Sequence, residues 1–335
     1  SFWKLTGLYE ILNARAKLIK SFLTQNPPMT DQDISYAGNN TEDEKDADGA
    51  VVAKYMNAII DGVAGDAKIK LLSPAFNMTS SFTPPLVKQM FEAGAKFTSL
   101  SACSGNVYTT GGTSAHDWYI SFLSSTGLGG KCNFLLTEFG DFDTFTKKPG
   151  ERPTVINKMY QDYNATIADS SILGAIYFNA LGGNPAFTGH KLLPEEYRAI
   201  IANNPTKSGV NSAMAFSNGQ FPIDASGFMK SGGFILEIAF SQGDAQSVAN
   251  SINAGLSKGL TTVVRICAGN TCSFSKPESY ISFLKDVSSK VNGSFYAIAG
   301  PNEPEAERWL EPTQTVAYSL NKIKLSKLIE KLPGC

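Results

Sequence analysis

The sequence lacks the features that mark several large classes of protein. Its net charge is −1 at pH 7, so it has no excess of positive charge to neutralise phosphates, and we expect no nucleic-acid partner. No apolar run of about 18 residues is present, so we expect no transmembrane segment. No Gly-x-Gly-x-x-Gly motif follows a predicted strand, which disfavours a dinucleotide-binding fold.

Histidine is also scarce. His116 and His190 are the only two, and they lie far apart in the sequence. A Ser-His-Asp mechanism or a histidine-rich metal site would depend almost entirely on one of them, so we expect neither. The acidic run at 42–48 lacks the glycine and the terminal glutamate of a calcium loop. The sequence therefore predicts no metal and no cofactor.

Cysteine is present in an odd number, five. Cys267 and Cys272 are close enough in sequence to close a small disulfide loop, which would suit an oxidising compartment and predicts an extracellular or cell-surface protein. The alternative is that all five are buried thiols, because spacing alone does not establish disulfide geometry.

Short apolar runs alternate with helical periodicity from residue 66 onward. Eight candidate strands follow one another: Ile69–Ser73, Ala95–Ser101, Phe134–Glu138, Leu173–Phe178, Val210–Phe216, Phe234–Phe240, Thr261–Cys267 and Phe295–Ala299. Helix start signals lie between them, for example at Thr83, Leu193, Asp244 and Ser275. Short strands that are apolar on both faces and alternate with amphipathic helices are typical of a parallel sheet covered by helices. Eight such units in about 270 residues predict an α/β fold, a closed (β/α)8 TIM barrel.

The predicted domain organisation has three parts. Residues 1–30 contain an amphipathic helix, residues 31–65 an acidic linker and a first barrel helix, and residues 66–335 the barrel with a helix over 316–329. The two terminal helices are basic and amphipathic, which is compatible with a membrane surface or a partner, or with packing on the barrel or on another copy of the chain.

Two glutamates end predicted strands. Glu138 ends a run within the string Thr-Glu-Phe-Gly at 137–140, and Glu303 follows another within Asn-Glu-Pro at 302–304. The C-terminal ends of barrel strands meet at one mouth, so we expect both carboxylates there. Two facing carboxylates are the equipment for cleaving a glycosidic bond, because one exchanges a proton and the other attacks the anomeric carbon.

These strings resemble those of the clan A glycoside hydrolases, which are retaining (β/α)8-barrel enzymes. The resemblance implies a carbohydrate substrate, Glu303 as the acid/base, Asn302 as a ligand of the sugar 2-hydroxyl and Glu138 as the nucleophile. It covers the two motifs and the strand rhythm, about half of the chain in loose terms.

The two motifs come in the reverse of the family's order. If the strand before Glu303 is the family's fourth, the chain presents the family's strands in the order 5-6-7-8-1-2-3-4, as a circular permutant. Residues 36–44 also look like a blurred copy of 298–307, and each copy precedes a predicted helix, 51–60 or 316–329. This duplication suggests a cut beside the fourth strand, although two acidic loops can also resemble each other by accident.

Further residues are candidates for binding the substrate at the mouth. We expect Asn106 and Tyr108 just after the second predicted strand, with His116 and Trp118 further along that loop, and Trp309 after Asn-Glu-Pro. Aromatic faces stack on sugars and a tyrosine hydroxyl can orient a carboxylate, although loop aromatics also simply pack. Arg265 is placed either to hydrogen-bond the nucleophile or to join a buried structural ion pair. Asn179 ends a strand where many relatives carry Trp, which would alter the sugar platform.

Two functions remain open from the sequence. The first is a retaining glycoside hydrolase. The second is a catalytically inactive barrel kept for carbohydrate binding or for self-assembly, in which the terminal helices join copies of the chain into a homo-oligomer or a filament.

Overall fold

The computed structural model describes residues 49–142, 161–178, 207–211, 231–266, 273–274 and 276–304, all of them within the compact unit Asp46–Cys335. The predicted terminal helices and acidic linker, and the helix expected from Leu193, lie outside these residues. Among the described residues, no helix is long and apolar enough to cross a membrane.

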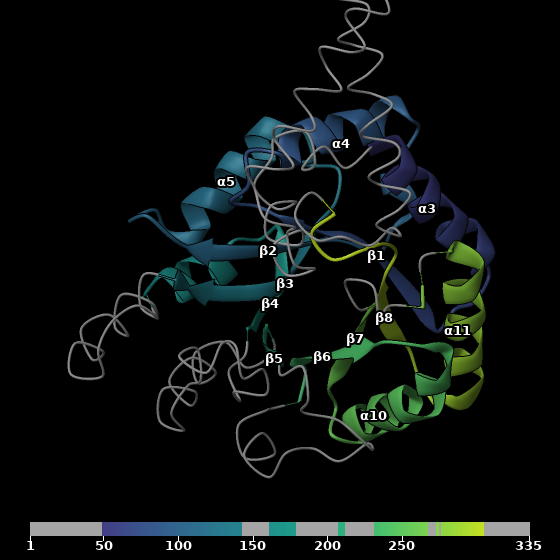
Figure 1. Cartoon of the computed structure of the whole chain (residues 1–335). Coiled ribbons are helices and arrows are strands. Elements are labelled where there is room, and N and C mark those ends of the chain that lie inside the picture. Colours follow the sequence, from purple (N-terminus) through teal and green to yellow (C-terminus); the bar gives the residue numbers. More distant parts are fainter. Residues whose placement is uncertain are drawn as a thin grey trace, which may run out of the picture. The chain divides into compact units, whose positions relative to one another are not determined.

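Eight parallel strands close into a barrel (Figure 1). In chain order they are β1 Ile69–Asn77, β2 Ala102–Thr109, β3 Phe134–Asp141, β4 Ile172–Tyr177, β5 Ser208–Asn211, β6 Phe234–Ala239, β7 Thr261–Ile266 and β8 Phe295–Ile298. Each pairs with the next, and β1 pairs with β8 in the register Ile69↔Phe295. The chain thus forms a parallel eight-stranded α/β barrel of the TIM type, as the strand rhythm predicts. The strands follow one another sequentially, so the circular permutation stays a prediction.

Helices cover the outside of the barrel. The described ones are α3 Gly49–Gly62, α4 Thr83–Glu92, α5 Ala115–Thr126, α10 Ala245–Ser257 and α11 Pro277–Lys290, with a further helical segment at 161–168. Figure 1 shows α3 between α4 and α11, although α3 precedes β1 in the chain. Helix α3 therefore occupies the position that the helix after the eighth strand takes in an ordinary barrel.

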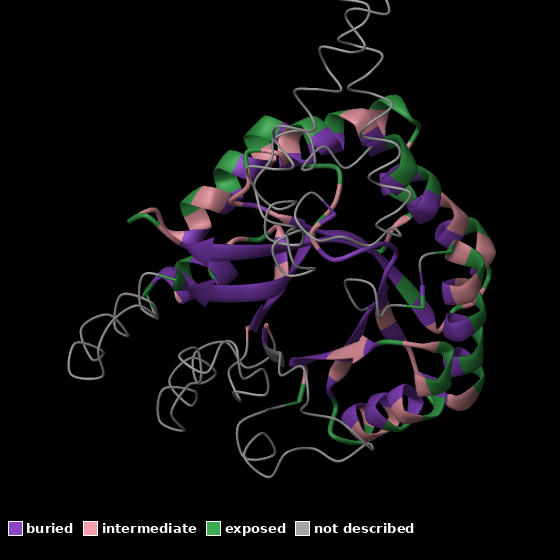
Figure 2. Cartoon of the chain, in the orientation of Figure 1, coloured by how far each residue is buried: buried purple, intermediate pink, exposed green. Residues whose placement is uncertain are grey.

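The strands separate two apolar cores. An inner core fills the barrel and consists of Leu72, Ala75, Ala102, Leu135, Ile176, Phe234, Leu236, Val263 and Ile298. A larger outer core lies between the strands and the inward faces of the helices, which alternate with exposed faces in Figure 2. Because side chains alternate along a strand, every second residue points into the barrel. Toward the C-terminal ends of the strands, these inward-pointing residues are polar and face the mouth.

A β-bulge in β3 interrupts this alternation just before Glu138. Gly105 pairs with Leu136, and the next residue of β2, Asn106, pairs with Glu138, so Thr137 is the extra residue. Leu135 lies in the inner core and Phe139 in the outer core, an even separation that strict alternation does not allow. The bulge therefore turns Glu138 toward the barrel interior.

The second predicted strand, Ala95–Ser101, is wrong. Its residues include a 3-10 helix, Phe97–Ser99, and the strand begins only at Ala102. Consequently Asn106 and Tyr108 lie within β2 rather than after it. The Ser-Gly-Asn sequence at 104–106 is typical of a loop, but Gly105 is needed where β1 approaches closely, because a Cβ there would lie 2.9 Å from the carbonyl oxygen of Phe76. The prediction Val210–Phe216 agrees with β5 at residues 210–211, and residues 212–216 lie outside the described residues.

A disulfide joins Cys103, near the start of β2, to Cys132, just before β3. The prediction that all five cysteines are thiols is therefore wrong. No local pattern indicates this pair, because the two residues are 29 positions apart and meet only through the parallel pairing of β2 with β3. Cys267 and Cys272 lie outside the described residues.

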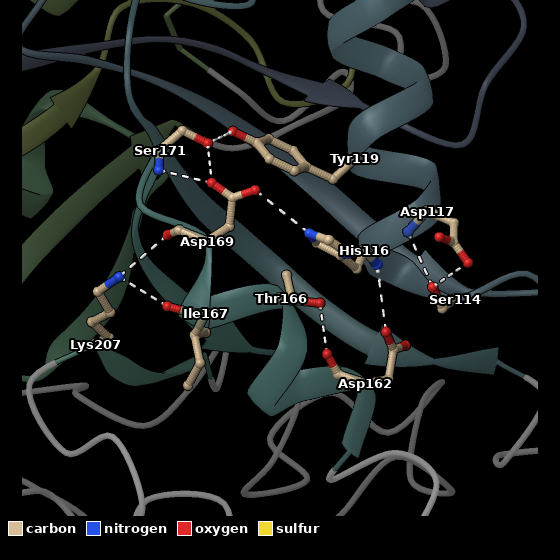
Figure 3. A network of polar contacts seen from close by, with 10 residues as sticks. All are labelled: Ser114, His116, Asp117, Tyr119, Asp162, Thr166, Ile167, Asp169, Ser171 and Lys207. Atoms are coloured by element: carbon tan, nitrogen blue, oxygen red, sulfur yellow. Dashed lines mark hydrogen bonds and ion pairs between the residues drawn. The ribbon is translucent and has the colours of Figure 1, made fainter.

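The prediction that His116 and Trp118 lie in a loop at the mouth is also wrong, because both residues belong to α5. The carboxylate of Asp162 accepts hydrogen bonds from the N–H groups of Ala115 and His116, at 2.9 and 3.4 Å. It thereby caps the start of α5. His116 Nε2 lies 3.5 Å from Asp169 Oδ2 (Figure 3). These contacts join α5 to the segment 161–168 on the outside of the barrel.

Candidate active site

Polar side chains from four strands and from the turn after β8 converge at the C-terminal end of the barrel. They are Asn77 of β1, Asn106 and Tyr108 of β2, Glu138 of β3, Arg265 of β7, and Asn302 and Glu303. The two glutamates therefore share one mouth, where parallel α/β barrels carry their active sites.

Glu138 accepts hydrogen bonds on both carboxylate oxygens. Arg265 Nη1 donates to Oε1, and the hydroxyl of Tyr108 donates to Oε2. The Glu138 side chain is only 7% exposed and that of Arg265 only 10%. A guanidinium on one oxygen and a hydroxyl donor on the other hold the Glu138 carboxylate in one orientation.

Tyr108 keeps the proton that it donates. Burial raises the pKa of its hydroxyl well above the ordinary value, and the neighbouring charges of Glu138 and Glu303 raise it further. Its ring centroid lies 4.4 Å from that of Phe142, which is 38% exposed, and 6.1 Å from that of Phe178. Tyr108 thus connects the buried carboxylate to an aromatic surface at the mouth.

Glu303 is bound differently. Its Oε1 accepts from Asn106 Nδ2 at 2.9 Å and its Oε2 from Asn77 Nδ2 at 3.3 Å, and both donors are neutral. Burial raises the pKa of this carboxyl to about 7, and the negative charge of Glu138 adds to the increase, while the two amides and Arg265 oppose it. At neutral pH, Glu303 therefore exists in both protonated and ionised forms, which suits a group that gives and takes a proton.

The backbone also places Glu303. Its φ of 40° makes it the one non-glycine residue with positive φ among those described. Its N–H donates to the Ala75 carbonyl at 2.7 Å, and Asn302 forms an isolated parallel bridge with Ala75. An unfavourable backbone conformation of this kind persists only where the surroundings enforce it, and such residues cluster at functional sites.

Arg265 and Asn106 both contact Asn302. Arg265 Nη1 and Asn106 Nδ2 each donate to Asn302 Oδ1 at 3.1 Å. The oxygen of the Asn302 amide is therefore occupied, and its nitrogen is the end left to donate elsewhere.

The structure brings together six of the ten residues predicted at the mouth: Glu138, Glu303, Asn302, Tyr108, Asn106 and Arg265. His116 and Trp118 lie in α5 instead. Asn106 has its side chain buried and directed at Glu303. Trp309 and Asn179 lie outside the described residues.

Asn77 and Thr137 were missed. Asn77 lies at the end of β1, four residues beyond the predicted end at Ser73, and a bulge precedes it. Thr137 is the bulged residue of β3. Both are polar residues near the end of a strand, and this is the only sequence signal by which they could have been predicted.

No group of three or more His, Cys, Asp or Glu residues that could hold a metal ion occurs in the described part of the chain. The chemistry available at the mouth is that of one carboxylate held by a guanidinium and a hydroxyl and of one carboxyl whose pKa is raised to about 7.

Comparison of the chain with protein-family models, with the curated proteins and with the solved structures finds no match in any of the three. The function is therefore inferred from the barrel and from the contacts at its mouth.

Proposed function

We propose that the protein is a retaining glycoside hydrolase of the clan A type, with Glu138 as the nucleophile and Glu303 as the acid/base. The observation that carries the proposal is the contrast between the two glutamates. Glu138 bears a cation and a hydroxyl donor on its oxygens, whereas the pKa of Glu303 is raised to about 7. A double displacement requires one carboxylate held in position to attack and one carboxyl that gives and takes a proton.

The mechanism follows from these roles. A Glu138 oxygen attacks the anomeric carbon of the sugar while the glycosidic C–O bond breaks, and protonated Glu303 transfers its proton to the departing oxygen. Glu303, now ionised, takes a proton from water as that water attacks the same carbon. The bond to Glu138 then breaks, the sugar is released with its original anomeric configuration, and Glu303 is protonated again.

The surrounding residues support each step. Arg265 and Tyr108 orient the Glu138 carboxylate for attack. They also stabilise the negative charge that returns to this carboxylate when the covalent intermediate breaks down. The amide nitrogen of Asn302 is available to donate to the substrate because its oxygen is already occupied. Phe142, half-exposed beside Tyr108, offers an apolar face to a sugar ring.

The test is hydrolysis of a panel of glycosides by the full chain. Glu138→Ala should lower kcat/KM for activated aryl glycosides by on the order of 10³-fold or more, because the attacking group is lost. Glu303→Ala should lower the rate more for a poor leaving group, such as an alkyl alcohol or a sugar, than for a nitrophenol, which departs without a proton.

Glu237→Gln is the matched control. Glu237 is a carboxyl on β6 that also has a pKa raised to about 7 by burial, but it faces Ser251 of α10 rather than the mouth. Its substitution should leave turnover unchanged. Full activity of Glu138→Ala would refute the assignment, and so would a product of inverted configuration in an NMR time course.

We also propose the circular permutation. It is supported by helix α3, which precedes β1 yet lies between α4 and α11, where the helix following the Glu303 strand is expected. A chain rearranged to begin before β5 and to run through β8 directly into α3 should fold to the same barrel, as judged by circular dichroism and by retained activity, because a closed barrel has no privileged first unit.

A second candidate function is favoured by the same position of α3. Because α3 already fills this place in the ring, we propose that the helix predicted over 316–329 binds another copy of the chain, which would give an oligomer or a filament. Light scattering of the full chain and of a variant lacking residues 316–335 compares their masses. A smaller assembly for the shortened variant, together with no hydrolysis by the full chain, would favour assembly over catalysis.

The cellular location proposed is extracellular or cell-surface. The Cys103–Cys132 disulfide supports it, because disulfides persist in oxidising compartments.

A further inference from the structure

The hydrogen bonds at the mouth have a direction that starts at Arg265. A guanidinium can only donate, so the atom of Asn302 that faces Arg265 Nη1 at 3.1 Å must be the amide oxygen. The oxygen and the nitrogen of an asparagine amide cannot otherwise be told apart by their shape. Arg265 therefore determines the orientation of the Asn302 amide.

The orientation of Asn302 in turn determines that of Asn106. The Asn106 amide faces two acceptors, Asn302 Oδ1 at 3.1 Å and Glu303 Oε1 at 2.9 Å. Only its nitrogen can donate to both, so its oxygen must point the other way. At that side lies the hydroxyl of Thr137, whose Oγ1 is 2.9 Å from Asn106 Oδ1 and thus acts as the donor.

Thr137 reaches Asn106 because of the bulge in β3. It is the extra residue between the pairs Gly105↔Leu136 and Asn106↔Glu138, and its side chain is fully buried. Its hydroxyl also lies 3.3 Å from the Gly105 carbonyl, a weaker contact. The one bulge thus places Glu138 in the mouth and a hydroxyl against Asn106.

We propose that Thr137 is a positioning residue for Glu303: its hydroxyl holds the Asn106 amide so that Nδ2 donates to Glu303 Oε1. The proposal rests on the proposed function in one respect, since it assigns a consequence for the acid/base step. The contact that it describes does not depend on catalysis.

The consequence for Glu303 has a definite sign. A donor on a carboxylate oxygen favours the ionised form and so opposes the increase in pKa that burial produces. The other groups that influence this carboxyl are Asn77 from β1, the charge of Glu138 from β3 and that of Arg265 from β7, and Tyr108 from β2 lies beside them. Weakening the Asn106 bond alone should raise the pKa of Glu303.

The experiment is a carboxyl-carbon NMR titration of the full chain labelled with ¹³C at the glutamate side-chain carboxyl. Glu303→Gln and Glu237→Gln identify the two signals that titrate near neutral pH. Thr137→Val removes the hydroxyl at constant shape, and Thr137→Ser restores it. Thr262→Val is the matched control, because Thr262 is buried on β7 with a hydroxyl that has no hydrogen-bond partner.

In Thr137→Val the Glu303 signal should titrate about 0.5 to 1 pH unit higher, the portion of a charge-assisted hydrogen bond that a loosened amide gives up. Thr137→Ser and Thr262→Val should titrate as the wild type does. A folded Thr137→Val with an unchanged Glu303 titration would overturn the proposal, and so would an equal shift in Thr137→Ser. If Thr137→Val does not fold, Thr137→Ala gives the same comparison with less crowding in the bulge.

Hydrolysis of an alkyl glycoside by the same variants separates the two proposals. If the wild type hydrolyses it, the alkaline limb of its pH profile should move with the Glu303 signal in Thr137→Val. If the wild type shows no hydrolysis but the Glu303 signal still moves, the positioning role stands and the hydrolase falls. If the wild type hydrolyses the glycoside but the Glu303 signal does not move in Thr137→Val, the hydrolase stands and the positioning role falls.

Discussion

Two glutamates buried in the same mouth acquire different properties from their neighbours. Glu138 meets Arg265 and Tyr108, whereas Glu303 meets only neutral amides, and the charge of Glu138 is part of its surroundings. At this scale the chemistry is decided by which donor lies on which oxygen rather than by the residue type.

The raised pKa of Glu303 predicts a pH dependence. The acid form is needed to protonate the leaving group, and it is lost as the pH rises through about 7. We therefore expect kcat/KM for a substrate with a poor leaving group to fall tenfold per pH unit above that value. An alkyl glycoside should show this limb clearly, and a profile that stays flat to pH 9 would remove Glu303 from the acid role.

Glu237 allows a prediction about stability. Its pKa is raised from 4.5 to about 7, chiefly by burial, so the folded state binds its proton more tightly than the unfolded state does. This contribution to stability is fully present below about pH 4.5 and is lost as the pH rises through 7. Glu237→Gln should raise the free energy of unfolding, relative to the wild type, by about 1–3 kcal/mol at pH 8.5.

Urea denaturation at pH 8.5 and at pH 5 measures this difference. The gain should shrink at the lower pH, where the folded wild type already carries the proton. Equal effects of Glu237→Gln at the two values would show that the titration of Glu237 is not responsible.

The sequence was sufficient for Glu138 and Glu303 because each follows an apolar run at a strand end. It was insufficient for Asn77 and Thr137, whose importance depends on contacts between strands that no local pattern encodes. Asn106 and Tyr108 were predicted at the mouth although the strand was predicted at the wrong residues. The prediction still placed them there because the last residues of a strand and the first residues after it both lie at the mouth.

At the scale of single elements, β3 shows why alternation alone misplaces side chains. Strict alternation from Leu135 would point Glu138 at the helices, and the extra residue Thr137 restores it to the interior. Strand β2 was misplaced for a related reason. Its Ser-Gly-Asn segment is polar because it lines the barrel and is satisfied there, for example by the 2.8 Å bond from the Ser104 N–H to Ser73 Oγ.

The start of α5 depends on a carboxylate from outside the helix. Asp162 accepts the N–H of Ala115 and the hydroxyl of Thr109 while almost completely buried. Asp162→Ala should therefore lower the free energy of unfolding by about 1–3 kcal/mol, since buried donors lose a charged acceptor. Asp117→Ala, at an exposed position in the first turn of the same helix, should cost under about 1 kcal/mol. Equal costs in urea denaturation would contradict the role of Asp162.

For the whole molecule, the Cys103–Cys132 disulfide restricts the unfolded chain. It closes a loop between residues 29 positions apart. In the chain-entropy account, removing it should destabilise the protein by about 3–4 kcal/mol. The double variant Cys103→Ala with Cys132→Ala is compared with the wild type in urea, with and without a reductant. The reductant should lower the stability of the wild type toward that of the variant, and no loss in either case would refute the expectation.

The global fold was the most predictable property of this chain. Eight apolar runs in sequence predict a closed parallel barrel, because a sheet covered by helices leaves a strong and repeated hydrophobic signal. The disulfide was not predictable, since it depends on which strands become neighbours and on their register.

Closure between β1 and β8 has a kinetic consequence. Asn77 and Glu303 are 226 positions apart, and Asn302 bridges directly to Ala75, so the mouth is assembled across the seam between the first and the last strand. Contacts at such separation are slow to form because a long loop must be closed first. During synthesis, a chain that has emerged only as far as β7 already contains Glu138 but lacks its counterpart. We therefore expect the two glutamates to meet only when β8 has paired with β1 and the ring is closed.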